Sequence, residues 1–444
     1  MQSNIPTKTV LKIAEKLANP DYIHKVSTAP KNTFFNKTTH PWNPFSLDFG
    51  YPALIIFFSE INAIFPDKLW VKARNHYTQT IIHELKSLGY HSISLSHGLT
   101  GIAYALWIAS LKDESYKNLH TKIHHLLLCK FQTVTTPNVK KSGYTSYDLL
   151  CGICGYISYL LNFTHEPFSV ELIKKFLTII VQISGPLKIE SQTVPGWLNP
   201  PDFFLDLPTE VAQEFLNLYP QGFFDLGVAH GISGYLSTLG KSLLCGIEVP
   251  KQVESILYII DWLKNTRQSV ASVPKVWPRR FGFNPSKSTI FESKCDFYFD
   301  GWSYGAPGIY NSILLAAKAL KNEPLKRYCV KEFIQQIPRI KCYNYHKQLS
   351  FCYGAAGILS IAHQFLSLDK SEEISNLNDF LSHKIINEMD DSAPFGLKCI
   401  PLSVNPRTAT PINNFGLISG VIGILLSLLM PYKNNNWPAI FMLR

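Results

Sequence analysis

A short motif, in which two residues separate two glycines, recurs along the whole chain. Six copies keep both glycines, and a seventh, weaker copy ends in alanine. They read Gly50-Tyr-Pro-Ala53, Gly98-Leu-Thr-Gly101, Gly152-Ile-Cys-Gly155, Gly231-Ile-Ser-Gly234, Gly305-Ala-Pro-Gly308, Gly354-Ala-Ala-Gly357 and Gly420-Val-Ile-Gly423. One such motif is a weak signal, but seven of them at spacings of about 50 to 80 residues indicate a repeat architecture.

An apolar run follows each motif. Runs such as IAYALWIAS and ILSIAHQFL carry almost no charge, which is typical of helices that are buried on all sides. Between them lie amphipathic stretches, such as residues 253–265 and 325–337, that indicate outer helices with one solvated face. Seven alternations of inner and outer helices predict an all-α, single-domain, seven-repeat α/α toroid with the GxxG loops at one end. Chemistry is then expected on those loops.

Two explanations fit the repeated glycines. A tight loop before a buried helix needs residues that tolerate unusual dihedrals, and glycine also lets neighbouring backbones approach closely. Residues 1–40 precede the first motif and are predicted to form an N-terminal helical extension, with the toroid over residues 41–444. Residues 415–430 contain no charge, but they fall short of the ~18–20 residues that span a bilayer and predict a buried helix.

Composition limits the classes of function. The net charge of +10 is scattered, and no basic run is longer than Lys140 with Lys141 or Arg279 with Arg280, so we expect a solvated basic surface and no nucleic-acid partner. Nine irregularly spaced cysteines and the absence of a secretory signal favour the cytoplasm. A basic surface also permits peripheral contact with an anionic membrane.

Polar side chains stand beside several motifs. Asp148 lies four residues before Gly152, while His230 and His97 directly precede Gly231 and Gly98. The fifth and sixth motifs are preceded by Trp302, Ser303 and Tyr304 and by Cys352 and Tyr353. Together these groups could perform acid–base catalysis on a bound substrate. In the alternative interpretation Asp148 caps the following helix, Trp302 and Tyr304 only line a cavity, and His97 is a core histidine that bonds to the backbone.

Four strings, YDLLCGICG, GVAHGISG, GWSYGAPG and SFCYGAAG, resemble signature motifs of the lanthionine synthetase C-like (LanC) cyclases. The resemblance implies a seven-repeat α-toroid that adds cysteine thiols to dehydroalanine or dehydrobutyrine in a ribosomally made, lantibiotic-type peptide. It also implies a zinc ion that activates the thiol, and a histidine that handles the proton of the enolate. On this basis His230, Asp148 and Tyr304 are predicted to be catalytic, and Trp302, Tyr353 and Ser303 to bind substrate.

The metal site departs from the family pattern. Ser303 stands where the family has its first zinc cysteine, and Tyr353 stands where it has a histidine. Only Cys352 remains of the three ligands, and Phe299 replaces an arginine that the family places four residues before the first cysteine. Hydroxyl groups are poor zinc ligands, so a full zinc site is not expected. Cys151 and Cys154 form a CxxC pattern that could rebuild a metal site or serve redox chemistry, although one of them is expected to pack inside.

Three hypotheses follow. The first is a divergent, zinc-poor lanthionine cyclase with a precursor peptide as substrate and a dehydratase and exporter complex as further partners. The second is a LanC-like scaffold that binds the precursor peptide or the dehydratase without chemistry. The third is a glycan-processing α/α barrel, which needs paired carboxylates, and only Asp148 lies on a motif, with Asp225 and Asp300 nearby. The proline-rich residues 185–222 are expected to form an excursion that grips the substrate.

Overall fold

The structure is a computed structural model, and it describes residues 5–34, 39–135, 146–189, 192–201, 209–269, 274–284, 289–292, 300–342, 348–401, 410–432 and 435–443. The chain divides into two compact units. Unit 1 combines Met1–Lys130 with Lys341–Arg444, and unit 2 is Phe131–Ile340. Phe299 and parts of the 185–222 segment (residues 190–191 and 202–208) lie outside the described residues.

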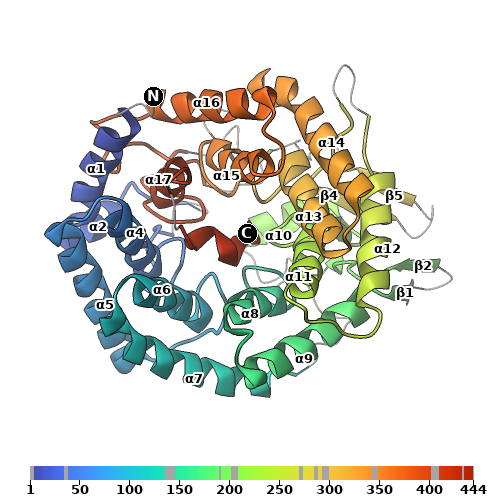
Figure 1. Cartoon of the computed structure of the whole chain (residues 1–444), viewed down its shortest axis with the longest axis horizontal. Helices are drawn as coiled ribbons and strands as arrows, with labels where there is room; N and C mark the ends of the chain where they lie inside the picture. Colours follow the sequence, from blue (N-terminus) through green and yellow to red (C-terminus); the bar gives the residue numbers. More distant parts are fainter. Residues whose placement is uncertain are drawn as a thin grey trace. The chain divides into compact units, whose positions relative to one another are not determined.

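A helix begins at each of the seven motifs, as predicted (Figure 1). Most residues of these helices are buried, which confirms the assignment of the apolar runs to inner helices. In unit 1 the inner helices are α4 (Tyr51–Ile64), α6 (Leu99–Lys112), α15 (Ala355–Leu366) and α17 (Val421–Leu428). In unit 2 they are α8 (Ile153–Leu160), α11 (Ile232–Leu244) and α13 (Gly305–Ala319).

Close backbone approach, more than unusual dihedrals, explains the glycines. Gly98 has φ −146° and Gly231 has φ −118°, values that other residues also adopt. A Cβ atom on Gly98 would lie 2.4 Å from the carbonyl oxygen of Ser92, and one on Gly231 equally close to that of Asp225. Gly305, with φ +83°, is an exception among the motif glycines. The expectation of unusual dihedrals was therefore wrong at Gly98 and Gly231, because the loop backbone folds back onto the start of its own helix.

The same loops supply acceptors for the first N–H groups of the inner helices. The N–H of Cys154 donates to the carbonyl of Tyr147, and that of Ala355 donates to the carbonyl of Gln348. The ends of α8 and α15 are thus satisfied by backbone oxygens, and their N-cap glycines provide no side chain. Polar side chains on these loops remain available for other bonds.

Longer amphipathic helices pack along the inner ones. Within unit 1, α5 packs along α4 and α16 along α15; within unit 2, α9 packs along α8 and α12 along α11 (Figure 1). These partners confirm the predicted outer helix over residues 253–265, and α14 contains the one predicted over 325–337. The bounds are α1 (Ile5–Leu17), α2 (Pro20–Ser27), α5 (Lys68–Leu88), η1 (Glu114–Tyr116), α7 (Lys117–Thr133), η3 (Leu161–Phe163), α9 (Pro167–Ile183), α10 (Thr209–Leu218), α12 (Gln252–Asn265), α14 (Glu323–Cys342), α16 (Glu372–Asn387) and η6 (Trp437–Phe441).

Unit 2 also contains short strands that the sequence did not predict. β1 (Pro186–Ile189) and β2 (Gln192–Pro195) form a hairpin. β3 (Phe223–Asp225), β4 (Arg280–Asn284) and β5 (Thr289–Glu292) form an antiparallel sheet in that order. Within the 185–222 segment lie β1, β2 and α10, while its role in gripping a substrate stays a prediction.

Within unit 1 the first repeat contacts the last. The carboxylate of Asp48, a buried residue before α4, accepts hydrogen bonds from the N–H groups of Ile418 (2.9 Å) and Ser419 (2.7 Å) and from the Ser419 hydroxyl. Burial raises the pKa of Asp48. Near the other end of α4, Glu60 accepts the N–H groups of Asn436 (2.8 Å) and Trp437 (3.1 Å). Two buried carboxylates therefore join segments about 370 positions apart in sequence.

In the described part of the chain, every helix is too short or too polar to cross a membrane. The buried helix predicted within residues 415–430 is α17.

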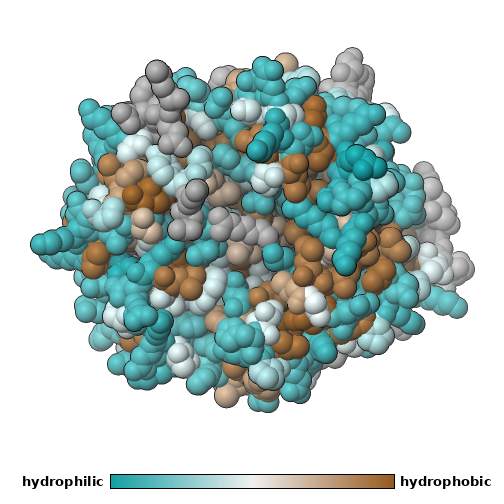
Figure 2. Space-filling model, viewed as in Figure 1, coloured by the Kyte–Doolittle hydropathy of each residue, from teal (hydrophilic) through white to brown (hydrophobic). Residues whose placement is uncertain are grey.

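Figure 2 shows a mostly hydrophilic face with a group of hydrophobic side chains over α11, α12 and α13. Exposed large hydrophobic residues of these helices are Leu244, Leu257 and Tyr258.

Candidate active site

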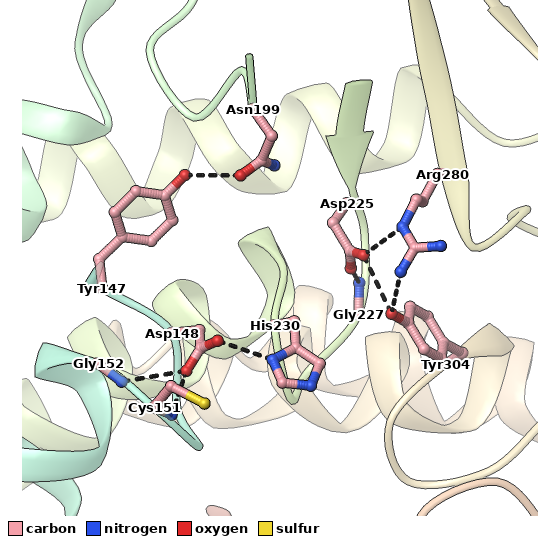
Figure 3. Close-up of polar contacts among 10 residues, drawn as sticks. All are labelled: Tyr147, Asp148, Cys151, Gly152, Asn199, Asp225, Gly227, His230, Arg280 and Tyr304. Carbon is pink, nitrogen blue, oxygen red and sulfur yellow. Dashed lines mark hydrogen bonds and ion pairs between the residues drawn. The ribbon is translucent and has the colours of Figure 1, made fainter. Parts of the chain in front are cut away.

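His230 and Asp148 form a hydrogen-bonded pair in unit 2 (Figure 3). Nδ1 of His230 lies 2.7 Å from Oδ2 of Asp148. The Asp148 side chain is completely buried, and that of His230 is 18% exposed, so the pair reaches the surface only through the imidazole. Because an ionised carboxylate can only accept, the proton lies on Nδ1, and in the neutral ring Nε2 is the basic nitrogen. The pair is therefore arranged for acid–base chemistry.

The other oxygen of Asp148 binds its own loop. Oδ1 accepts hydrogen bonds from the N–H groups of Cys151 and Gly152, just before α8. The alternative interpretation of Asp148 as a cap is thus partly right, because the carboxylate satisfies amides next to the helix start. It does not exclude the catalytic interpretation, since Oδ2 still bonds to His230. These bonds fix the direction of the carboxylate.

A second buried group lies in the same unit. Asp225 at the end of β3 is paired in register with Arg280 at the start of β4. Its Oδ2 accepts from Nε of Arg280 (2.9 Å) and from the hydroxyl of Tyr304 (3.0 Å), while Nη2 of Arg280 lies 3.3 Å from that hydroxyl (Figure 3). Tyr304, predicted to be catalytic, is the N-cap residue of α13. Its hydroxyl is held by a buried ion pair.

Trp302 and Ser303 precede Tyr304, and both side chains are completely buried. The carbonyl of Ser303 accepts the N–H of Val228 (2.7 Å), which joins this loop to that of His230. The hydroxyl of Ser303 has no hydrogen-bond partner among the described residues. Complete burial in the free protein is unfavourable for direct substrate binding by Trp302 and Ser303, so that role stays a prediction.

Cys352 and Tyr353 lie in unit 1, on the loop before α15. Cys352 is buried and Tyr353 is partly exposed, and the N–H of Tyr353 donates to the hydroxyl of Ser350 (3.3 Å). Among the described residues, no three His, Cys, Asp or Glu side chains come together in a way that could hold a metal ion. A serine hydroxyl, a phenol and one thiol are not the donor set that zinc prefers. The residues at the family's ligand positions therefore do not fit a zinc site.

Cys151 and Cys154 differ in their surroundings. Cys151 is partly exposed, whereas Cys154 is buried in α8. Burial raises the pKa of the Cys154 thiol, although a hydrogen bond with Thr238 opposes this. A thiol of raised pKa is a weak nucleophile and metal ligand. This agrees with the expectation that one cysteine of the CxxC pattern packs inside.

His97 occupies the same position in its motif as His230 but has different partners. Its Nδ1 lies 3.0 Å from the hydroxyl of Ser46, and its side chain is exposed. The expectation that His97 is a core histidine was wrong, because the loop before α6 turns this side chain toward solvent. His97 and Ser46 both belong to unit 1.

Arg280 is the residue of this region that the sequence interpretation missed. Arg279 and Arg280 were assigned to a solvated basic surface, yet both are buried. The assignment was wrong because the strands that pair Arg280 with Asp225 were not predicted. Pairing of the segments FFD and RFGFN as strands would have placed the two charges opposite each other, but segments this short carry too weak a strand pattern to be recognised from the sequence.

Comparisons with known proteins agree with this geometry. The sequence profile described as "Lanthionine synthetase C-like protein" matches residues 41–442. The nisin biosynthesis protein NisC of Lactococcus lactis subsp. lactis is 23% identical over 379 residues, which cover 81% of this chain and 84% of that protein. The solved structure of nisin cyclase superposes with a TM-score of 0.76 at 19% identity, over 99% of this chain and 98% of that one. This likeness confirms the predicted fold class, a helical toroid, together with the resemblance stated from the motifs.

Proposed function

The chain belongs to the lanthionine synthetase C-like protein family, and on that premise we propose that it is a divergent thioether cyclase. It adds cysteine thiols to dehydroalanine or dehydrobutyrine in a ribosomally made peptide of the lantibiotic type. The observation that carries the proposal is the bond between His230 and Asp148, which unites a buried carboxylate with a partly exposed imidazole. A scaffold that only holds a peptide has no need of such a pair.

His230 performs both proton transfers of the addition. Nε2 of the neutral ring takes the proton from the cysteine thiol, and the sulfur forms a bond to the β-carbon of the dehydroamino acid. The electron pair of the double bond moves to the α-carbon and its carbonyl as an enolate. The imidazolium then returns the proton to the α-carbon, so the ring ends in its starting state. Asp148 holds the tautomer and stabilises the imidazolium.

No step of this scheme passes through zinc. Ser303, Tyr353 and Cys352 would not hold the ion, so thiol activation falls to His230. The addition is intrinsically facile, and a cavity that brings thiol and alkene together accelerates it by orientation alone. Trp302, Tyr353 and Ser303 are retained as proposed substrate contacts, with partly exposed Tyr353 the most accessible of the three in the free protein.

Ring formation by the wild-type protein tests the proposed function. Purified protein is mixed with a chemically dehydrated Cys/Ser/Thr-rich peptide at neutral pH, and remaining thiols are counted by alkylation and mass spectrometry. Thioether rings should form about 100-fold or more faster than without protein. A rate equal to the uncatalysed one, together with measurable peptide binding, would assign the chain to the scaffold function instead.

Metal content is a separate prediction. The protein, purified without chelators, should carry clearly less than one zinc per chain by elemental analysis, because two of the family's three ligand positions hold hydroxyl groups. Addition of a chelator should leave ring formation unchanged. Stoichiometric zinc that resists dialysis would contradict the prediction and would direct attention to Cys352, Cys151 and Cys154.

The partners follow from this chemistry. A dehydroamino acid must first be made from serine or threonine, so a dehydratase is proposed to act before this protein, and an exporter after it. We further propose a cytoplasmic location, where thiols stay reduced, with peripheral contact at the membrane. The basic net charge of +10 suits an acidic precursor segment or an anionic lipid face.

A further inference from the structure

Asp225, Arg280 and Tyr304 form a buried charged cluster that the proposed reaction does not use. Their exposed fractions are 1%, 5% and 2%. The guanidinium of Arg280 also lies 5.5 Å and 5.4 Å from the ring centroids of Phe215 and Phe223. A buried ion pair is a poor source of stability, because apolar side chains of similar volume often serve as well. Its presence points to a requirement for fixed geometry.

The cluster fixes the loop that carries His230. Oδ1 of Asp225 accepts the N–H of Gly227 (2.9 Å). The N–H of Leu226 donates to the carbonyl of Arg279 (3.0 Å). The N–H of Val228 donates to the carbonyl of Ser303, the residue before Tyr304. Three consecutive residues after Asp225 are thus held by the cluster or by its direct neighbours, and His230 follows two positions later.

The loop of Asp148 completes this arrangement. The N–H of Leu149 donates to the carbonyl of Ala229 (3.1 Å), the residue directly before His230. The backbone on the N-terminal side of the imidazole is therefore tied on one side to the loop of Asp148 and on the other to β4 and α13. A shift of either side changes the angle between imidazole and carboxylate.

Tyr304 takes part through its hydroxyl and its ring. The hydroxyl donates its proton to Asp225 and accepts from Arg280, so in this arrangement it is committed to the ion pair. A Cβ atom on Gly227 would lie 2.6 Å from a ring carbon of Tyr304, so the ring packs directly on the loop backbone. These contacts favour a supporting role for Tyr304 over direct proton transfer.

We infer that Arg280, Asp225 and Tyr304 are positioning residues that hold the His230 loop in the geometry needed for proton transfer. The expected effect on kcat rests on the proposed function, whereas the expected effect on the structure of the loop does not. Asp225 holds the loop through the N–H of Gly227, and Arg280 fixes the direction of the Asp225 carboxylate. The ring of Tyr304 packs against the backbone at Gly227.

The test replaces Arg280 by methionine, which keeps the volume and removes the charge. Arg280→Met should lower kcat for ring formation about 10- to 100-fold, because small misplacements of a catalytic group have effects of that size. KM for the dehydrated peptide should change by less than about threefold. Hydrogen–deuterium exchange of residues 226–230 should become about tenfold faster. Arg280→Lys, which keeps the charge but cannot reproduce the planar fork, should give intermediate values for both measurements.

A second arginine cluster in unit 2 provides the matched control. Nη1 of Arg267 lies 2.7 Å from Oε2 of Glu332 and 3.4 Å from the hydroxyl of Tyr310, which bonds to the same carboxylate at 3.0 Å. This cluster also combines an arginine, a carboxylate and a tyrosine, with glutamate in place of aspartate, but none of these bonds reaches the loop of His230. Arg267→Met should also lower the unfolding temperature, while kcat and the exchange of residues 226–230 stay at wild-type values.

The outcomes separate the two proposals. If the wild-type protein forms no rings, the proposed function fails, and a faster exchange of residues 226–230 in Arg280→Met alone still supports the positioning role. If both arginine variants show the same exchange in this loop, or if kcat of Arg280→Met falls only as the folded fraction falls, the positioning role is wrong.

Discussion

His230→Ala is expected to reduce ring formation on a dehydrated precursor to the uncatalysed rate. The variant loses both the base for the thiol and the acid for the enolate. General acid–base catalysis typically contributes about 10²- to 10⁴-fold to a reaction rate. Precursor binding should change little, because the imidazole is one partly exposed side chain of the site. Alkylation with mass spectrometry measures the rings, and fluorescence anisotropy of a labelled precursor measures binding.

His97→Ala is the control for this experiment. His97 directly precedes the first glycine of its motif, as His230 does, but its Nδ1 bonds to the hydroxyl of Ser46, whereas Nδ1 of His230 bonds to Asp148. Its removal should leave the rate of ring formation within about twofold of wild type, as expected for an exposed histidine outside the proposed catalytic pair. If His230→Ala cyclises as fast as His97→Ala, then His230 has no catalytic function and the proposed mechanism fails.

Asp48→Ala is expected to give the largest loss of stability. It leaves the N–H groups of Ile418 and Ser419 and the Ser419 hydroxyl without their acceptor in the interior of unit 1. Unsatisfied buried donors cost about 1–3 kcal/mol each, so the free energy of unfolding should fall by about 3 kcal/mol or more. Urea unfolding followed by circular dichroism measures this as a lower midpoint.

Asp48→Asn separates the loss of hydrogen bonds from the effect of charge. Asparagine keeps an acceptor for the two N–H groups and can donate to the Ser419 hydroxyl. Because burial raises the pKa of Asp48, the folded state binds its proton more tightly than the unfolded state, and this contribution to stability is lost as pH rises. Relative to wild type, Asp48→Asn should therefore gain stability as pH rises above the unfolded value of about 4.

Asp67→Ala provides the comparison for both variants. Asp67 caps α5 at the surface of the same unit, where its carboxylate accepts the N–H of Leu69 at 2.7 Å. Loss of such a cap costs about 1 kcal/mol. Equal midpoints for Asp48→Ala and Asp67→Ala would show that the buried contact between the first and last repeats adds nothing beyond an ordinary cap.

The fold was predictable from the sequence because its repeat requires glycine for a steric reason. At Gly354, a Cβ atom would lie 2.0 Å from the carbonyl oxygen of Gln348, so no other residue fits without a shift of the loop. Because of this requirement a glycine recurs in each repeat, and its position predicts the start of each inner helix. His230 and Asp148 were predicted to act together for a different reason, namely the resemblance of GVAHGISG and YDLLCGICG to motifs of the LanC cyclases.

The cluster around Tyr304 has no comparable sequence motif. Asp225 and Arg280 are separated by 55 residues and meet only because two strands of three and five residues pair. Strands this short show too few alternations to be recognised, and two adjacent arginines resemble surface residues. Only the tertiary structure shows that Arg280 lies opposite the carboxylate of Asp225 and forms a buried ion pair with it.

The contacts of Asp48 and Glu60 with the last segments of the chain have a consequence for its synthesis. Helix α4 leaves the ribosome well before Asn436 and Trp437, which bond to Glu60 from positions 376 and 377 residues later in the sequence. The apolar face that α4 presents to α17 therefore stays uncovered until residues 421–428 have been translated. Early release or premature termination leaves this surface uncovered, and exposed apolar helices aggregate or bind chaperones. Unit 1 can therefore complete its packing only after the residues from α17 to Trp437 have been translated.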